Sequence, residues 1–466
     1  MKIHRLILPV VFPAGLSPGE AKTTNLLTVA RDGKGRPVLR GTALAGAMRQ
    51  AWRERIDDNG KDTTDLLFGA SVGDNDTIDR PSSLEVADVL LCTDKDSISF
   101  KPHNQINRHN GTVLKGNLFS LEALPPGTKA TLVLWCREHT EGLLAGRGEA
   151  AMKSIAAIFQ QGLILGGRSN RGVGLARLCA ACAATLLTYD LGDIDQHAQY
   201  LDDHHAWRQS NTEKLSIGHE VTGEGNQSTS LAIEITWRIP RGQDLLVADG
   251  AGQEQQTVID VNGDQHWRLP GSSLRGVMRS WINRLAAREG KPVAFDVNEH
   301  MTAIEENREI TGEDVGYAFL SKAEREQPEA YKLIKCPVSK LFGTMLQRGR
   351  IHIADALSPV KEHLKQVRMH VAIDRITGGA KDGALFKNEV IIGSQVESPR
   401  FTSIILVNDP TEDEVRWICK TIKAIDLGVV RIGTRKAAGR LELAEPIKAT
   451  GRFAEQFNTL ATKQPA

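Results

Sequence analysis

A glycine-flanked serine pair is the clearest candidate for ligand chemistry in this sequence. Gly271, Ser272 and Ser273 stand directly before an apolar pattern with helical spacing. The start of a helix presents free backbone amides, and serine hydroxyls add further donors, so such a segment can bind an anion such as phosphate. Arg275 and Arg279 follow one helical turn apart and can add charge-assisted contacts. An ordinary helix cap with solvated arginines explains the same residues, so this motif alone leaves both alternatives open.

Two glycine-rich segments also carry basic side chains. They span 166–174 and 432–440, and the residues that could contact a phosphate are Gly167, Arg168, Arg171, Gly433, Arg435, Lys436 and Arg440. Glycine permits close approach of the backbone, and arginine and lysine attract phosphate oxygens. One such loop is often only a turn, but its recurrence with basic residues favours phosphate binding.

The two halves of the chain repeat each other. Residues 38–49 match residues 268–279 at an offset of 230, which gives the first copy of the motif Gly41, Thr42 and Arg49. Leu-Phe-Gly recurs at 67–69 and 341–343, and the segment that begins at His103 matches the one that begins at His370, at an offset of 267. Because the blocks keep the same order, we expect a duplicated domain.

The repeat predicts the domain boundaries. We expect a first module over 1–189, a polar linker over 190–227 and a second module over 228–466. The growth of the offset indicates a charged insertion at 288–333 in the second module. Residues 223–230 are typical of a flexible connector, and the histidines and aspartates near residue 200 are explained most simply as solvated linker residues.

Hydrophobic patterns predict the elements of each module. Apolar runs at 3–12, 130–134, 231–239 and 403–407 indicate strands. Helices are expected after Gly41 and Gly271, over 149–161, and from Thr411 to about Ile425, where Thr411 and Glu414 form a capping-box pattern. This order of strands and helices predicts an α+β fold made of two tandem ferredoxin-like, or RRM-like, modules.

The composition excludes several classes of protein. With 466 residues, 41% apolar and 25% charged, the chain is typical of a globular protein of several domains. The 58 basic and 57 acidic residues nearly cancel, so a polyanion must meet local basic patches. Sparse cysteines and the lack of a long apolar window suggest a cytoplasmic protein without a membrane partner. Cys179 and Cys182 have zinc-like spacing, but they lie in an apolar run and are expected in the core.

The motifs taken in order resemble those of a known family. Pro-Gly-Ser-Ser-Leu-Arg-Gly at 270–276, Ile-Asp-Arg-Ile-Thr-Gly-Gly-Ala at 373–380 and the closing glycine-rich loop look like the RAMP superfamily of CRISPR-associated proteins. The match is similar to the backbone subunits of type III effector complexes. It is good over 231–443 and degraded over 3–178, and two modules in one chain resemble the fused subunits of type III-D systems.

The resemblance implies a long β-hairpin, or thumb, in each module. In this family such a thumb crosses the duplex of guide and target RNA and displaces a base pair. Here the apolar residues near the tip would be Ile376, Leu385 and Phe386, and the basic residues Arg375, Lys381 and Lys387, with Arg108 in the first copy. The alternative, that Leu385 and Phe386 lie in the core, stays open at this point.

The resemblance also implies a cleavage site, formed in the family by an aspartate in the loop ahead of the Pro-Gly-Ser-Ser motif. Counting back 15 residues from Pro270 gives Gln255, and the same count from Arg40 gives Asn25. Neither amide can replace a carboxylate as a base or metal ligand. Because loop alignments slip, the candidates are the nearby carboxylates, with the first two preferred: Glu254, Asp249, Asp260 and Asp264. The first module is expected to be inactive, unless Glu20 or Asp32 substitutes.

Taken together, these expectations describe a subunit that binds guide RNA and holds it paired with target RNA beside other type III effector subunits. Target cleavage would need a divalent metal such as Mg²⁺ or Mn²⁺. The alternatives are a stand-alone or guide-processing endoribonuclease of the same superfamily and an RNA scaffold that does not cut.

Overall fold

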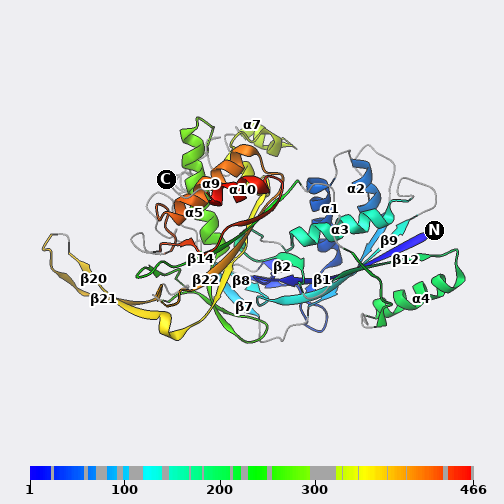
Figure 1. Cartoon of the computed structure of the whole chain (residues 1–466), viewed down its shortest axis with the longest axis horizontal. Coiled ribbons are helices and arrows are strands. Elements are labelled where there is room, and N and C mark those ends of the chain that lie inside the picture. The colour runs from blue at the N-terminus through cyan, green and yellow to red at the C-terminus, as the bar shows by residue number, and fades with distance from the viewer. Residues whose placement is uncertain are drawn as a thin grey trace.

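A computed structural model describes most of the chain and shows two modules side by side (Figure 1). The described residues are 1–462 without the following segments: 23–25, 57–60, 70–80, 92–97, 104–118, 139–145, 167–168, 181–182, 210–213, 222–228, 249–253, 294–321, 328, 345, 375, 395 and 434–438. The described helices include none that is long and apolar enough to cross a membrane.

The first module is built on an antiparallel sheet. Its core strands lie in the order β11 (Leu175–Leu178), β1 (Lys2–Phe12), β9 (Thr128–Glu138) and β5 (Leu84–Val86). Numbered along the chain, this order is fourth, first, third and second, which is that of a ferredoxin-like β-α-β-β-α-β unit. β12 (Ala184–Asp190) pairs with β1 and then with β13 (His219–Val221), and so extends the sheet.

The second module repeats the same arrangement. Its core strands lie in the order β23 (Glu442–Leu443), β14 (Leu231–Arg238), β22 (Arg400–Val407) and β18 (Ile351–Ile353). β24 (Lys448–Gly451) also pairs with β14. The predicted α+β fold of two tandem ferredoxin-like modules is therefore confirmed.

Two helices cover one face of each sheet, as the helical spacing of apolar residues predicted. α1 (Gly41–Arg55) and α3 (Gly148–Gln161) bury side chains such as Met48 and Ile155 in one core with β1 and β9. α5 (Gly271–Arg288) and α9 (Glu412–Asp426) do the same in the second module.

The expected capping box at the start of α9 is present. Thr411 accepts a hydrogen bond from the Glu414 amide, and Glu414 accepts one from the Thr411 amide. These reciprocal bonds satisfy two amides that a helix start would otherwise leave free. Apolar residues that recur at helical spacing, among them Val415, Ile418 and Ile422, then bury one face of the helix.

A long hairpin extends from the second module. β20 (Lys365–Ile373) and β21 (Ala380–Ile392) pair antiparallel between β18 and β22 in the chain, and β15 (Asp244–Leu245) joins their base. Figure 1 shows this hairpin projecting from the body, as expected of a thumb. In the first module β7 (Ser99–His103) and β8 (Phe119–Ala123) pair at the equivalent place.

Shorter elements complete the two modules. They are β2 (Gly19–Lys22), β3 (Leu26–Val29), β4 (Val38–Leu39), α2 (Lys61–Phe68), β6 (Val89–Leu90), β10 (Leu163–Ile164), η2 (Ser169–Arg171), β16 (Thr257–Ile259), β17 (Gln265–Leu269), α7 (Lys322–Arg325), η4 (Ala330–Leu333), α8 (Pro337–Phe342), β19 (Ala356–Pro359), η5 (Glu362–Leu364) and α10 (Ala454–Thr462). The expected insertion at 288–333 begins at the last residue of α5 and contains α7 and η4.

The segment 190–227 is more than the polar linker expected from its composition. It contains β13, which extends the sheet of the first module, and α4 (Ile194–Arg208), which packs against that sheet. Asp203 is buried, and it accepts a hydrogen bond from Arg5 at 2.5 Å. The sequence pattern missed this helix because it buries only a narrow face, chiefly Asp203 and Trp207. Of the expected flexible stretch, 223–230, residues 223–228 lie outside the described residues, whereas Ser230 is described, buried and bonded to Gln161 at 2.8 Å.

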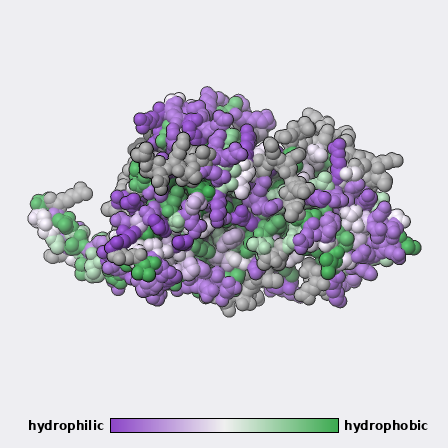
Figure 2. Space-filling view, in the orientation of Figure 1, coloured by the Kyte–Doolittle hydropathy of each residue, from purple (hydrophilic) through white to green (hydrophobic). Residues whose placement is uncertain are grey.

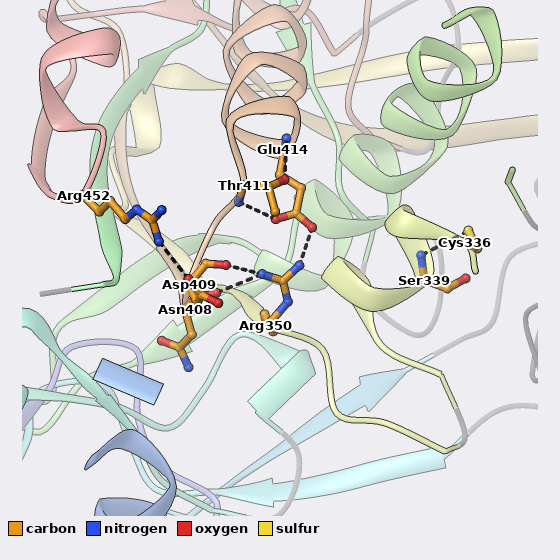
Figure 3. A network of polar contacts seen from close by, with 8 residues as sticks. All are labelled: Cys336, Ser339, Arg350, Asn408, Asp409, Thr411, Glu414 and Arg452. Carbon is orange, nitrogen blue, oxygen red and sulfur yellow. Dashed lines mark hydrogen bonds and ion pairs between the residues drawn. The ribbon is translucent and has the colours of Figure 1, made fainter. Parts of the chain in front are cut away.

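The two modules share a contact surface with polar anchors. One of these is the turn between β22 and α9 (Figure 3), where Arg350 donates hydrogen bonds to the carbonyls of Asn408 and Asp409 and pairs with Glu414. The side chain of Asn408 in turn accepts a bond from Arg55 of α1 at 3.2 Å. The start of α9 is thereby tied to the first module.

Candidate nucleic-acid interface

The start of α5 is closed by an internal carboxylate. The amide of Gly271 donates a hydrogen bond of 2.8 Å to Asp355, which is buried. A Cβ at Gly271 would lie 2.0 Å from the carbonyl oxygen of Ile353, so only glycine fits there. The amide of Ser273 bonds to the carbonyl of Pro270. The first amide of this helix therefore serves the fold, and the expected phosphate site does not include it.

The first module repeats this closure. Gly41 donates its amide to Asp88 at 2.8 Å, and a Cβ at Gly41 would lie 2.5 Å from the Val86 carbonyl oxygen. Asp88 and Asp355 are 267 residues apart, the offset already seen elsewhere in the repeat. The glycine of the repeated Gly-Ser/Thr motif thus serves packing, whereas Thr42 is exposed and Ser272 and Ser273 are half-buried.

The arginines behind the motif also make internal contacts. Arg275 donates to the carbonyls of Phe342 and Ile351 and lies over the ring of Phe342 at 5.1 Å. Arg49 pairs with Asp65 at 2.7 Å. These contacts hold the neighbouring Leu-Phe-Gly turn and α2 in place. RNA contact by Arg49, Arg275 and the half-buried Arg279 stays a prediction.

The glycine-rich loops lie at matching places in the two modules. Gly166 and Gly433 both have positive φ, and a Cβ would lie 2.6 Å and 2.5 Å from the carbonyl oxygens of Ser17 and Leu246. The described basic members, Arg171 and Arg440, are half-buried. The other expected contact residues of these loops lie outside the described residues: Gly167, Arg168, Arg435 and Lys436.

The thumb presents apolar side chains to solvent. Ile376 is 95% exposed, Leu385 66% and Phe386 50%, so the alternative that Leu385 and Phe386 lie in the core is excluded. Lys381 is exposed near the tip, and Arg375 lies outside the described residues. Figure 2 shows apolar residues gathered along the projecting hairpin. Exposed apolar groups on a hairpin that leaves the body are suited to contact with bases.

The two thumbs share one strand register. His370 lies opposite Phe386 with ring centroids 5.1 Å apart, and His103 lies opposite Phe119. Arg108 and the rest of the first tip lie outside the described residues. Part of the stem of the first thumb is buried, however: Lys101 and His103 are buried, and Lys101 pairs with Asp355 of the second module, whereas Phe100 is 61% exposed.

The loop carboxylates do not form a common site among the described residues. Asp260 accepts bonds from the amides of Asn262 and Asp264 and from His266, so it fixes a turn. Desolvation raises the pKa of Asp260, but these bonds outweigh it and hold the pKa below its ordinary value. Glu254 and Asp264 are exposed, and Asp249 lies outside the described residues.

Gln255, at the place where the family motif would put its aspartate, is a structural residue. It is buried, accepts the Val247 amide at 2.7 Å and donates to the Arg268 carbonyl at 2.8 Å. The described part of the chain holds no group of three or more His, Cys, Asp or Glu side chains that could bind a metal. The described residues therefore do not fit a metal held by the protein alone.

The expected core position of Cys179 is only partly met. Cys179 follows β11, is half-buried and is a free thiol, and Cys182 lies outside the described residues.

A basic pocket at the base of the thumb was missed by sequence reasoning. It has a volume of about 580 Å³ and lies between the ends of β14, β19 and β21. Its cationic lining residues are Arg238, Arg241, Lys361 and Arg400. Glu442 and Glu397 also line it and pair with Arg238 and Lys361. No local motif marks this pocket, because its cations come from separate segments of the chain that meet only at the base of the thumb.

Comparison with known proteins agrees with this architecture. A family model of the RAMP superfamily matches residues 9–177 and 223–442, one region in each module. No curated protein matches the chain. Because the two regions cover most of the sequence and coincide with the two ferredoxin-like units, the chain belongs to the RAMP superfamily, which supports a CRISPR-associated role in RNA binding.

Proposed function

We propose that this protein is a backbone subunit of a type III CRISPR ribonucleoprotein, in which it binds guide RNA and holds it paired with target RNA. The thumb of the second module carries this proposal, because its apolar tip is exposed where a folded protein would normally bury such residues. The partners would be guide RNA, target RNA and the other subunits of the complex, in the cytoplasm. Two fused modules also favour the type III-D arrangement.

The chemistry of the thumb and its base supports this division of work. Ile376, Leu385 and Phe386 can contact unstacked bases, whereas the cations of the basic pocket can contact phosphates without reading sequence. Sequence would then be read by pairing between the two RNA strands. The nearly neutral net charge fits this scheme, because the cations are concentrated locally.

Two alternative functions remain, an RNA scaffold that does not cut and a nuclease. Of these, the observations favour the scaffold. Gln255 occupies the expected catalytic place and is used by the fold. If the second module cuts target RNA, we infer that Glu254 or Asp249 supplies the carboxylate and that Mg²⁺ or Mn²⁺ is bound jointly with RNA. Loss of cleavage in Glu254→Ala or Asp249→Ala with RNA binding intact would support cleavage, whereas unchanged cleavage in both would remove this assignment.

The main experiment is to purify the chain together with the products of neighbouring genes and the adjacent repeat array, and to sequence the bound RNA. Short RNAs with a common repeat-derived end are expected. Random RNA, or none, would contradict the proposal and favour the stand-alone nuclease or a scaffold outside CRISPR complexes.

A second arm tests the basic pocket. Arg241→Ala with Arg400→Ala should weaken RNA binding and reduce its salt dependence, because fewer counterions are released. The matched control is Arg284→Ala with Arg288→Ala on the exposed end of α5, which should leave both unchanged. If both double substitutions changed RNA affinity equally, the pocket would not be part of the RNA interface.

A further inference from the structure

One face of the second sheet receives the first module. Ile404 and Leu406 of β22, together with Ala354, form a buried apolar cluster with Ile164 and Leu175 of the first module. The second module thus has a receiving face, defined by Ala232, Ala354, Ile404 and Leu406, and the first module has a presenting edge, defined by Ala14, Ile164 and Leu175.

Strand register identifies the equivalent face on the first module. Leu406 pairs with His352 and Ala232, and Trp135 pairs with Glu85 and Arg5. Trp135 therefore occupies the place of Leu406, and Val133 that of Ile404. Ala87 occupies the place of Ala354, since these two residues precede the equivalent aspartates Asp88 and Asp355. The first module accordingly carries its own copy of the receiving face.

This copy is covered by α4. Val133 and Trp135 are buried in one cluster with Trp207 and Leu215, and Ala87 and Tyr200 pack against it. The rings of Tyr200 and Trp207 each lie 5.6 Å from that of Trp135. α4 thus lies where, on the second module, the presenting edge lies.

The polar anchor of the interface is also replaced on the first module. In the second module Asp355 pairs with Lys101 of the first module. The second module offers no cation directly before Gly271, because that residue is Pro270. In the first module the residue before Gly41 is Arg40, and it pairs with Asp88 at 3.0 Å. An arginine of the same module therefore takes the role that a lysine of the neighbouring module has at Asp355.

The opposite end of the chain has lost the apolar presenting edge. Backbone bonds of the two glycine-rich loops are equivalent: Gly174 donates to Gly15, and Gly439 donates to Asp244. These bonds and the repeat offset give the second module's counterparts of Ala14, Ile164 and Leu175, which are Gln243, Arg431 and Arg440. Polar and cationic side chains would be costly to bury against an apolar face.

We infer that two copies of this chain cannot pack on each other in the way that its two modules do, and that α4 with Arg40 is the cap that keeps a second copy off the first module. α4 lies at the end of the molecule opposite the thumb (Figure 1). This inference concerns protein contacts alone and does not depend on the proposed binding of RNA.

Four full-length proteins test the cap. The first is the wild type. The second carries Gln243→Ala, Arg431→Ile and Arg440→Leu, which restore the apolar edge. The third carries Arg40→Pro, Tyr200→Ala and Trp207→Ala, which open the cap, and the fourth combines both sets. Sedimentation at increasing concentration reports the mass, and thermal unfolding checks that each protein is folded.

The first three proteins should be monomers, whereas the combined variant should show an apparent mass that rises about twofold or more with concentration. Adding Arg368→Glu should reverse this rise, because Arg368 is the counterpart of Lys101 and would meet Asp88 of the next copy. Self-association of the wild type, or of the edge variant with the cap closed, would overturn the inference. So would a folded combined variant that stays monomeric, or one whose association ignores Arg368→Glu.

A second way to open the cap guards against misfolding of the substituted helix. Replacement of 194–208 by a glycine-serine linker of equal length, in the edge variant that also carries Arg40→Pro, should give the same association. Leu201→Ala with His205→Ala on the exposed face of α4 is the matched control and should leave the edge variant monomeric.

Discussion

Lys101, on the stem of the first thumb, forms a buried ion pair with Asp355 of the second module. Their side chains are 1% and 2% exposed, and Lys101 also donates to the Arg171 carbonyl. Desolvation lowers the pKa of Lys101, and the attraction of Asp355 opposes this shift. Because Asp355 also accepts the Gly271 amide, one carboxylate joins the thumb of one module to the first helix of the other.

Lys101→Met should destabilise the protein strongly. It leaves the Asp355 carboxylate buried without its partner, which costs about 3–5 kcal/mol. Urea unfolding measures this change. Asp355→Asn in the same protein should recover part of the loss, because the uncompensated charge is then removed. Additive effects of the two substitutions would show that the pair is not coupled.

Gly271→Ala should destabilise the second module, because the new Cβ would lie 2.0 Å from a backbone oxygen that cannot easily move. We expect a loss of about 2 kcal/mol or more. The matched control is Gly276→Ala in the same helix, where nothing lies within 4 Å of the added Cβ. This control should stabilise the protein by roughly 0.5–1 kcal/mol. Similar effects of the two substitutions in thermal unfolding would contradict the packing role of Gly271.

Glu289 should contribute stability that is lost in acid. Hydrogen bonds from Arg416 and Trp417 are the main causes that lower its pKa to about 2 from 4.5. The pKa of Glu289 is lower in the folded protein than in the unfolded chain. Its contribution to the free energy of unfolding is therefore complete above pH 4.5 and disappears as the pH falls toward 2.

Glu289→Gln should therefore cost about 1 kcal/mol at neutral pH, where this partly exposed group is screened by water. It should flatten the pH dependence of unfolding between pH 4.5 and 2. Glu326→Gln, at an exposed position, is the control. If Glu289→Gln left the pH dependence of unfolding in acid unchanged, other groups would account for that dependence.

Replacement of apolar residues at the tip of the thumb by charged ones should weaken binding of the guide-target duplex. Ile376→Asp and Leu385→Asp remove apolar contact with bases, and full burial of an Ile or Leu side chain is worth about 1.5–3 kcal/mol. Affinity for duplex RNA should fall about tenfold, whereas thermal stability should stay unchanged because both side chains are exposed. Ile217→Asp, at a 92% exposed site outside the thumb, is the matched control. Equal RNA affinities of the tip variants and of Ile217→Asp would exclude a base contact at the tip.

Local patterns in the sequence were sufficient to predict the duplicated α+β fold. The capping box of Thr411 and Glu414, the helical spacing after Gly41 and Gly271, and the apolar strands each depend on neighbouring residues, so they can be read directly. The repeat added the equivalence of the two thumbs. The same patterns also suggested a phosphate site at Gly271, because a helix start looks alike whether a ligand or a carboxylate of the same chain closes it.

Only the tertiary structure decided which groups meet across the chain. Asp355 and Lys101 are 254 residues apart, and no local rule could join them, although the recurrence of Ala-Asp at 87–88 and 354–355 could have marked the aspartates. The burial of Asp203 against Arg5 likewise turned an apparent linker into part of a module. The sequence by itself therefore determined the main strands and helices of the two sheets, their duplication and the family resemblance, whereas α4, the pairing of buried charges and the closed faces depended on packing between distant segments.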